Sequence, residues 1–198
     1  MSKKRTVIAV GVAGLTAGLV LGPVQSALAG HTNPLTTAHL DGRSEVAPDG
    51  SRRLAGDPNG LGEAYVFPID NIKEMDGQGG FTTTDNSDTL CYVLTVDKVS
   101  GTENNPGAPY AAHIHRGAPG SNGPVVVNLA FPTGGEAADC VTETRVTGPS
   151  DTPVFARDAN GALLATAAEI RDFPERFYVN VHNAEHPTGA VRGQLHGH

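Results

Sequence analysis

The stretch Thr89-Leu90-Cys91-Tyr92-Val93-Leu94-Thr95-Val96 decides the fold class of this chain. Every second position from Leu90 to Val96 carries a large apolar side chain. This period of two is typical of a strand that buries one face and leaves the other polar or mixed. Residues 65–69 repeat the pattern, so the sequence predicts neighbouring strands on both sides of residue 80.

Five further segments have the composition of short strands, and Gly, Pro, Asn or Asp stands in most of the connections between them. These predicted strands are 36–41, 111–116, 124–130, 177–182 and 190–195. The stretches 41–60, 101–109 and 132–153 are rich in turn residues and are predicted to be surface loops. The charges within 41–60 are expected to be solvated.

One segment departs from the strand pattern. Residues 160–170 are rich in Ala and Leu, with apolar residues at helical spacing. We predict a short helix from about Gly161 to Arg171, capped by Asp158 or Asn160. Many short strands with one helix predict an all-β fold, a Greek-key antiparallel β-sandwich of the immunoglobulin-like or superoxide-dismutase-like kind.

The first 29 residues have the features of a Sec-type secretory signal peptide. A basic head, Lys3-Lys4-Arg5, precedes an apolar run, and the small-residue end Ala27-Leu28-Ala29 suits cleavage before Gly30. We expect a signal peptide at 1–29, a single domain at 30–198, and a secreted or extracytoplasmic protein without a stable membrane anchor.

Charge and cysteine content narrow the possible partners. Removing three basic residues with the signal moves the formal net charge from -7 to -10, which argues against nucleic acid as a partner. An exported chain with two cysteines is expected to form one disulfide, between Cys91 and Cys140. The competing interpretation is a pair of separate or metal-bound thiols.

Several separated motifs resemble the chordin-type (CHRD) domain family, in the order expected for it. They are Leu40–Val46, Leu90–Leu94, His113–Val126, Tyr178–His182 and Gly193–Leu195. The resemblance spans about residues 35–195 and implies an exported bacterial single-domain protein of unassigned role. The family is named for an animal protein that binds growth factors, but that activity does not transfer to one small domain.

Histidines on two predicted strands define the candidate site. Side chains at i and i+2 of a strand share a face, so His113 and His115 point the same way. If strands 177–182 and 190–195 form a hairpin with their valines inward, then Asn180, His182 and Arg192 lie together on its outer face. The three histidines meet only if their strands belong to one sheet.

Two interpretations of the histidines stay open. In the first, which we place ahead, they hydrogen-bond turns and one another, while Arg192 holds backbone carbonyls or an acid and Asn180 orients a loop. In the second, His113, His115 and His182 bind copper or zinc, because imidazole is a common ligand for both. The motif order also resembles the copper half of copper-zinc superoxide dismutases, but no histidine lies between 115 and 182 to supply the zinc ligands.

No other motif points to an enzyme. A G-x-S-x-G elbow, a phosphate-binding glycine loop and an H-E-x-x-H helix are all missing from the sequence. We assign no catalytic residues and favour a non-catalytic role without closing the question. The expected function is a secreted binding or structural module with an extracellular protein partner. The alternative is a copper-binding protein, for which redox activity stays open.

Overall fold

The computed structural model describes residues 35–51, 54–69, 72–75, 78, 80–84, 88–99, 111–147 and 152–197. The described residues belong to one compact unit of the chain. The predicted signal peptide and the predicted loop 101–109 lie outside the described residues. Among the described residues, no helix is long and apolar enough to cross a membrane.

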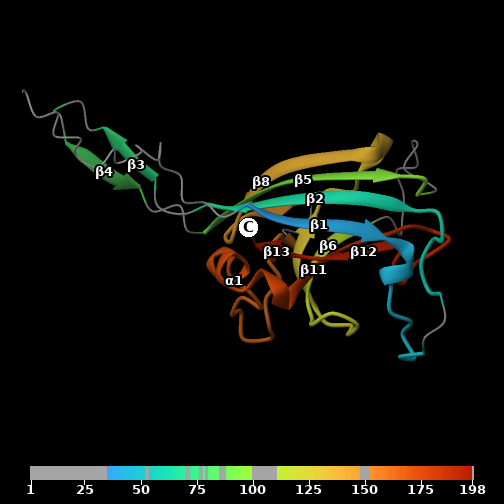
Figure 1. The fold of residues 1–198 in the computed structure, drawn as a ribbon. Helices are drawn as coiled ribbons and strands as arrows, with labels where there is room; N and C mark the ends of the chain where they lie inside the picture. The colour runs from blue at the N-terminus through green and yellow to red at the C-terminus, as the bar shows by residue number, and fades with distance from the viewer. Residues whose placement is uncertain are drawn as a thin grey trace, which may run out of the picture. The chain divides into compact units, whose positions relative to one another are not determined.

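Nine strands form one antiparallel sheet in the order β7-β6-β11-β12-β1-β2-β5-β8, with β13 also paired to β1. Figure 1 shows β1, β2, β5 and β8 side by side. The strands are β1 (Thr36–Asp41), β2 (Leu61–Pro68), β5 (Thr89–Asp97), β6 (Ala111–Arg116), β7 (Val125–Leu129), β8 (Glu136–Thr142), β11 (Phe177–His182), β12 (Val191–Gln194) and β13 (His196–Gly197).

The remaining elements are short. Two hairpins pair β3 (Ile72–Met75) with β4 (Phe81–Thr84) and β9 (Val146–Thr147) with β10 (Thr152–Pro153). The helical elements are α1 (Ala167–Asp172) and three 3₁₀ turns, η1 (Gly42–Ser44), η2 (Thr133–Gly135) and η3 (Pro174–Arg176).

The all-β class with one short helix is confirmed. The hydrogen-bonded pairing joins the main strands into one sheet, whereas the sequence predicted a two-sheet sandwich. Side-chain alternation tells which face of a strand is buried, but it does not tell whether backbone pairing continues from one strand to the next. The sandwich subtype therefore stays a prediction.

The prediction of a loop at 132–153 was wrong where this stretch forms strands. Residues 136–142 form β8, which pairs with β5, and the short strands β9 and β10 lie in the same stretch. The burial of β8 alternates only between exposed and intermediate until Val141, so it has no apolar stripe that would mark it in the sequence. Its pairing partner, rather than its own composition, makes it a strand.

One face of the sheet carries the hydrophobic core. Buried positions alternate along β1 and β2, whereas almost every residue of β11 and β12 is buried. The core includes Leu40, Val66, Leu94, Ile114 and Val179, all fully buried. The predicted inward valines of the last hairpin belong to this core. The residues between them, which include the three candidate histidines, therefore lie on the opposite face of the sheet.

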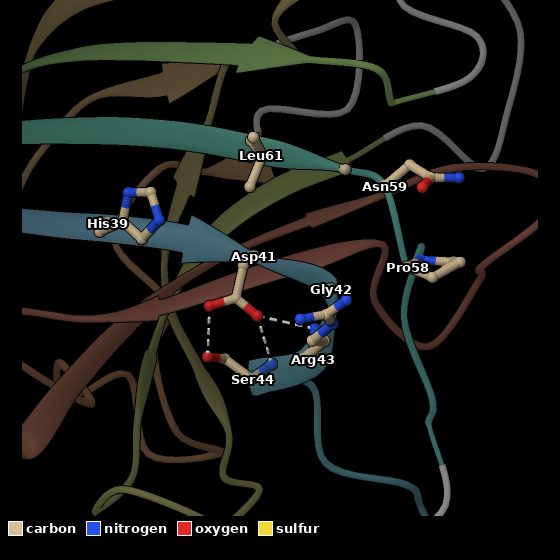
Figure 2. Close-up of a pocket in the computed structure, with 9 residues that line it drawn as sticks. His39, Asp41, Gly42, Arg43, Ser44, Pro58, Asn59 and Leu61 are labelled. Atoms are coloured by element: carbon tan, nitrogen blue, oxygen red, sulfur yellow. Dashed lines mark hydrogen bonds between the residues drawn. The ribbon is translucent and has the colours of Figure 1, made fainter.

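The chain turns sharply after β1. Asp41 caps η1 by accepting hydrogen bonds from the backbone nitrogens of Arg43 (2.7 Å) and Ser44 (2.8 Å) and from the Ser44 hydroxyl (2.9 Å), as Figure 2 shows. This cap directs the following residues, from Glu45 onward, toward the outer face of β12, which contacts η1.

The helix prediction was wrong at its start. The chain forms α1 only from Ala167, because Gly161 has a φ of +83° and ends the turn at 158–161, where Asp158 accepts from the nitrogens of Asn160 and Ala162. Thr166 is the cap, accepting from the Glu169 nitrogen at 3.0 Å.

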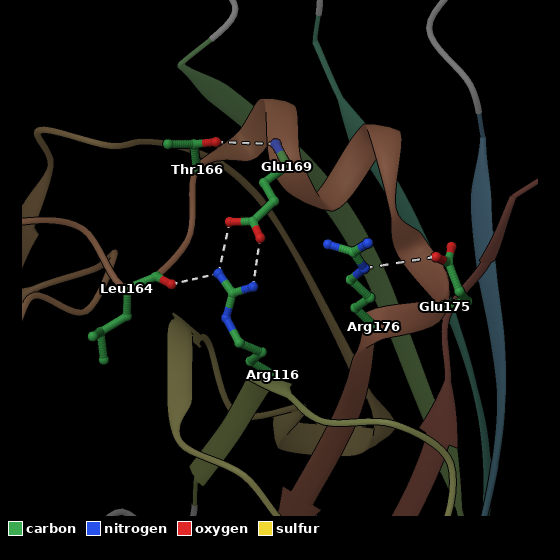
Figure 3. Close-up of polar contacts among 6 residues, drawn as sticks. All are labelled: Arg116, Leu164, Thr166, Glu169, Glu175 and Arg176. Atoms are coloured by element: carbon green, nitrogen blue, oxygen red, sulfur yellow. Dashed lines mark hydrogen bonds and ion pairs between the residues drawn. The ribbon is translucent and has the colours of Figure 1, made fainter.

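An ion pair attaches α1 to the sheet. Arg116, the last residue of β6, binds both carboxylate oxygens of Glu169 and donates to the Leu164 carbonyl at 2.6 Å (Figure 3). Both side chains are about one third exposed, at 34% and 28%. The bidentate geometry fixes the end of β6 immediately after His115.

A disulfide joins β5 to β8, as predicted. Cys91 and Cys140 are directly opposite each other in the pairing of the two strands. The bond links the two strands at the edge of the sheet opposite β7.

Candidate metal centre

The structure brings the three histidines together on adjacent strands. His113 and His115 lie on β6, and His182 ends β11, which pairs with β6 along its whole length. His113 is opposite Asn180 and His115 is opposite Tyr178. Opposite residues of an antiparallel pair project from the same face, so all these side chains share the outer face of the sheet.

The three imidazoles are close enough to share one ion. Their ring centroids are 5.5 Å apart for His113–His115, 5.1 Å for His113–His182 and 6.0 Å for His115–His182. One nitrogen from each ring lies within 4.8 Å of the other two. Three nitrogens bound to one ion at about 2.1 Å lie about 3.4–3.6 Å from one another, so the rings must move together by about an ångström to complete the site.

Hydrogen bonds set the orientation of two of the rings. His115 Nδ1 donates to the Gly123 carbonyl at 2.9 Å, and His182 Nδ1 donates to the Pro187 carbonyl at 3.2 Å. Because a carbonyl only accepts, both rings carry their proton on Nδ1, which leaves an electron pair on Nε2. A metal-binding histidine commonly has this arrangement, with its second nitrogen held by a carbonyl.

Three ring nitrogens have no hydrogen-bond partner within the described part of the chain. They are Nδ1 of His113, Nε2 of His115 and Nε2 of His182, and all three are buried. Buried polar atoms in folded proteins nearly always have partners, so three unsatisfied nitrogens in one cluster require an explanation.

The surroundings keep the rings neutral. Burial, together with the neighbouring histidines, lowers the pKa of His113 to about 4. Burial also lowers the pKa of His115 to about 4, with smaller contributions from His182 and Arg192, and it lowers the pKa of His182. Neutral imidazole is the form that binds metal ions, so the cluster is in a metal-binding state at neutral pH.

An aromatic residue and an arginine support His115. The Tyr178 ring is stacked on the His115 ring with a centroid distance of 4.8 Å and 6° between the planes. The Arg192 guanidinium lies 3.4 Å from the centroid of the Tyr178 ring. Because β11 lies between β6 and β12, His115 and Arg192 approach Tyr178 from opposite sides.

The loop 117–123 holds this stack in place. The Gly123 nitrogen donates to the Tyr178 hydroxyl at 3.2 Å, while its carbonyl accepts from His115. Arg192 donates to the carbonyls of Ala118 (3.4 Å) and Ser121 (2.8 Å) and to the Asn122 side chain (3.3 Å). A single loop therefore contacts all three layers of the stack.

Glu45 was missed by the sequence prediction. It lies in the stretch 41–60, whose charges were expected to be solvated, yet it is only 6% exposed. Asn180 donates to its Oε2 at 3.5 Å, while Oε1 has no partner within the described residues. Burial raises the pKa of Glu45 to about 8, against the lowering effects of Arg192 and Asn180. The one indication in the sequence that Glu45 belongs to the site was its position in Leu40–Val46, a motif that resembles the CHRD family.

The comparison with known families covers most of the chain. Residues 36–195 match the model of the CHRD domain. The chain belongs to the CHRD family. No curated protein and no solved structure matches this chain.

The other described histidines of this CHRD domain, His39, His186 and His196, do not join the cluster. His39 lies on β1 beside the pocket drawn in Figure 2 and binds Glu63 at 2.7 Å. The Asp41 carboxylate in the same pocket is committed to capping η1. His196 is exposed, and His31 and His198 lie outside the described residues. The pocket offers less for metal binding than the outer face of β6 and β11.

Proposed function

We propose that this CHRD-domain protein is exported and binds one copper ion through His113, His115 and His182. The observation that carries the proposal is the set of three buried, unpartnered ring nitrogens within 4.8 Å of one another. The predicted signal peptide and the Cys91–Cys140 disulfide support export, because disulfides persist in oxidising compartments.

The alternative, that the histidines only stabilise turns, explains some of the contacts of the three rings but not the others. Such a role accounts for the Nδ1 hydrogen bonds of His115 and His182 to backbone carbonyls. It does not account for the opposite nitrogens, which point away from these carbonyls and are buried without partners in the described structure. A bound ion would satisfy all three at once.

Copper is favoured over zinc by the ligand set. The cluster supplies three imidazoles, and no carboxylate or cysteine among the described residues joins it. Three histidines with an open position suit a catalytic zinc ion as well as copper, but the affinity of divalent ions for nitrogen ligands is highest for copper. An open coordination position then remains for a small exogenous ligand.

A second candidate function is binding of an extracellular protein partner. Tyr65 and Val93 are cross-strand neighbours on β2 and β5, and they are 39% and 40% exposed. This apolar pair lies on the outer face of the sheet, where a partner surface could cover it. Binding of a defined partner by the triple variant lacking the three histidines would favour this function over copper binding.

Metal titration of untagged protein tests the copper proposal. The wild-type chain should bind one Cu²⁺ per molecule, and the His113→Ala/His115→Ala/His182→Ala variant should bind none at the same affinity. The control variant His39→Ala/His196→Ala/His198→Ala loses the same number of histidines but keeps the cluster, so it should bind as the wild type does. If all three proteins bind the same amount of copper, well below one ion per molecule, the proposal is wrong.

A further inference from the structure

The residues around the three histidines place positive rather than negative charge near them. Arg192 is only 2% exposed and is separated from His115 by the Tyr178 ring alone. Within the described residues no carboxylate forms an ion pair with Arg192. The residue opposite Arg192 on β1 is Asp41. Its carboxylate oxygens accept hydrogen bonds from Arg43 and Ser44 instead.

The nearest buried carboxyl group does not offset this charge. Glu45 contacts Asn180 and lies within electrostatic reach of Arg192. Its side chain is enclosed by backbone, since a Cβ placed on Gly189 would lie 2.4 Å from Oε1 and one on Gly56 would lie 2.6 Å from the Glu45 Cγ. Burial of this kind raises the pKa of a carboxyl group and favours its neutral form.

The ligands themselves carry no charge. Three neutral imidazoles leave the full charge of the ion in place, +2 for the cupric and +1 for the cuprous state. Partial burial and a nearby guanidinium both penalise the more highly charged ion more strongly, because each effect grows with the charge of the ion. A thiolate or carboxylate ligand would reverse this preference, and the described cluster contains neither.

We propose that the site formed by His113, His115 and His182 favours the cuprous over the cupric ion, with Arg192 as the positioning residue that sets this preference through Tyr178. The inference rests on the proposed copper function and adds the oxidation state to it. The loop 117–123 contributes to this preference. Its carbonyls hold the Arg192 guanidinium against the Tyr178 ring, and its Gly123 carbonyl orients His115. The ligand is thereby specified as Cu⁺.

The experiment compares the affinities of the untagged protein for Cu⁺ and Cu²⁺ under anaerobic conditions, by competition with chelators selective for each ion. We expect the wild type to bind Cu⁺ more tightly than Cu²⁺. Arg192→Gln keeps an amide donor for the loop carbonyls but removes the charge. It should shift the ratio of the two affinities at least tenfold toward Cu²⁺, equivalent to a potential lower by about 59 mV.

A matched control separates charge from general effects. Arg176 also lies over an aromatic ring, that of Phe173 at 4.2 Å, but its side chain is more than half exposed. Arg176→Gln should leave the ratio within threefold of the wild type. A loss of stability alone would weaken the binding of both ions. The ratio of the two affinities changes only if the charge of Arg192 acts on the bound ion.

Two results would overturn the inference while leaving the copper function standing. One is tighter binding of Cu²⁺ than of Cu⁺ by the wild type, which decides the matter even if Arg192→Gln does not fold. The other is an unchanged ratio in folded Arg192→Gln protein. Absence of binding of either ion would instead overturn the proposed function itself.

Discussion

The Tyr178 ring lies parallel to the His115 imidazole, with 6° between their planes and 4.8 Å between their centroids. The distance equals the spacing of neighbouring strands, and the two residues are directly opposite in the pairing of β6 and β11. The pairing of the two strands therefore places the buried Tyr178 ring in contact with His115, a candidate ligand. Gly123 completes the arrangement by hydrogen-bonding both side chains.

Replacing Tyr178 should weaken copper binding without removing a ligand. In Tyr178→Leu, His115 loses its stacking partner and gains rotational freedom, and we expect the copper affinity to fall about 10–100-fold. Tyr65→Leu removes an exposed tyrosine from the same face of the sheet and should leave the affinity unchanged. Isothermal titration of both variants checks this. Equal affinities in Tyr178→Leu and Tyr65→Leu would show that the stack does not position His115.

Gly123→Ala should disturb both the fold and the site. A Cβ at this position would lie 1.7 Å from the Arg116 carbonyl oxygen, so the backbone after His115 must shift. We expect a loss of about 3 kcal/mol in the free energy of unfolding, measured in urea. Gly120→Ala in the same loop meets no atom within 4 Å and strains only its φ of +76°, so it should cost about 1 kcal/mol. A smaller cost for Gly123→Ala than for Gly120→Ala would contradict the packing described for this loop.

The buried carboxyl group of Glu45 predicts a particular pH dependence of stability. Its pKa rises from 4.5 to about 8 on folding, so between these values the folded chain binds more protons than the unfolded chain. The contribution of Glu45 to stability is therefore fully present below pH 4.5 and is lost as the pH rises to 8, at a slope of at most about 1.4 kcal/mol per pH unit.

The variant Glu45→Gln should remove this dependence. Arg192, Asn180 and Asp41 are the polar groups that act on Glu45, and all three remain in the variant. Denaturant unfolding at several pH values should show the variant gaining on the wild type between pH 5 and 8, with a constant difference above pH 8. A difference that does not change between pH 5 and 8 would mean that folding does not raise the pKa of Glu45.

The sequence predicts the strands that bury one face, because their apolar side chains alternate. The predicted bounds of β1, β6 and β11 are the same as those in the structure. It cannot predict β8, whose side chains lack an apolar stripe, nor the late start of α1, where the capping pair Thr166 and Glu169 competes with an Ala-rich run. Local composition favoured the longer helix, and the positive φ of Gly161 prevented it.

The candidate site, like the fold, can be predicted from the sequence only in part. Period-two reasoning places His113 with His115 and Asn180 with His182, but only the pairing of β6 with β11 brings the two sets together. Glu45 joins them through a loop fixed by the Asp41 cap, at a sequence distance that no local pattern spans. Long-range contacts of this kind depend on the register of the whole sheet.

The disulfide should stabilise the fold without affecting the site. Cys91→Ser/Cys140→Ser is expected to cost about 2–5 kcal/mol in the free energy of unfolding. In the sheet, β5 and β8 are separated from β6 and β11 by β12, β1 and β2, so the copper affinity of the folded variant should be unchanged. Thermal unfolding and copper titration of one sample measure both quantities. A large loss of affinity in folded protein would mean that the far edge of the sheet shapes the site.

Crystallographic localisation of copper is the most direct measurement for the metal site. Untagged protein crystallised with copper should show one anomalous peak at the copper absorption edge for each chain. We expect this peak at about 2.0–2.1 Å from Nδ1 of His113, Nε2 of His115 and Nε2 of His182. A peak only at other histidines, or an undisturbed cluster of three unoccupied rings in crystals that hold copper elsewhere, would contradict the account.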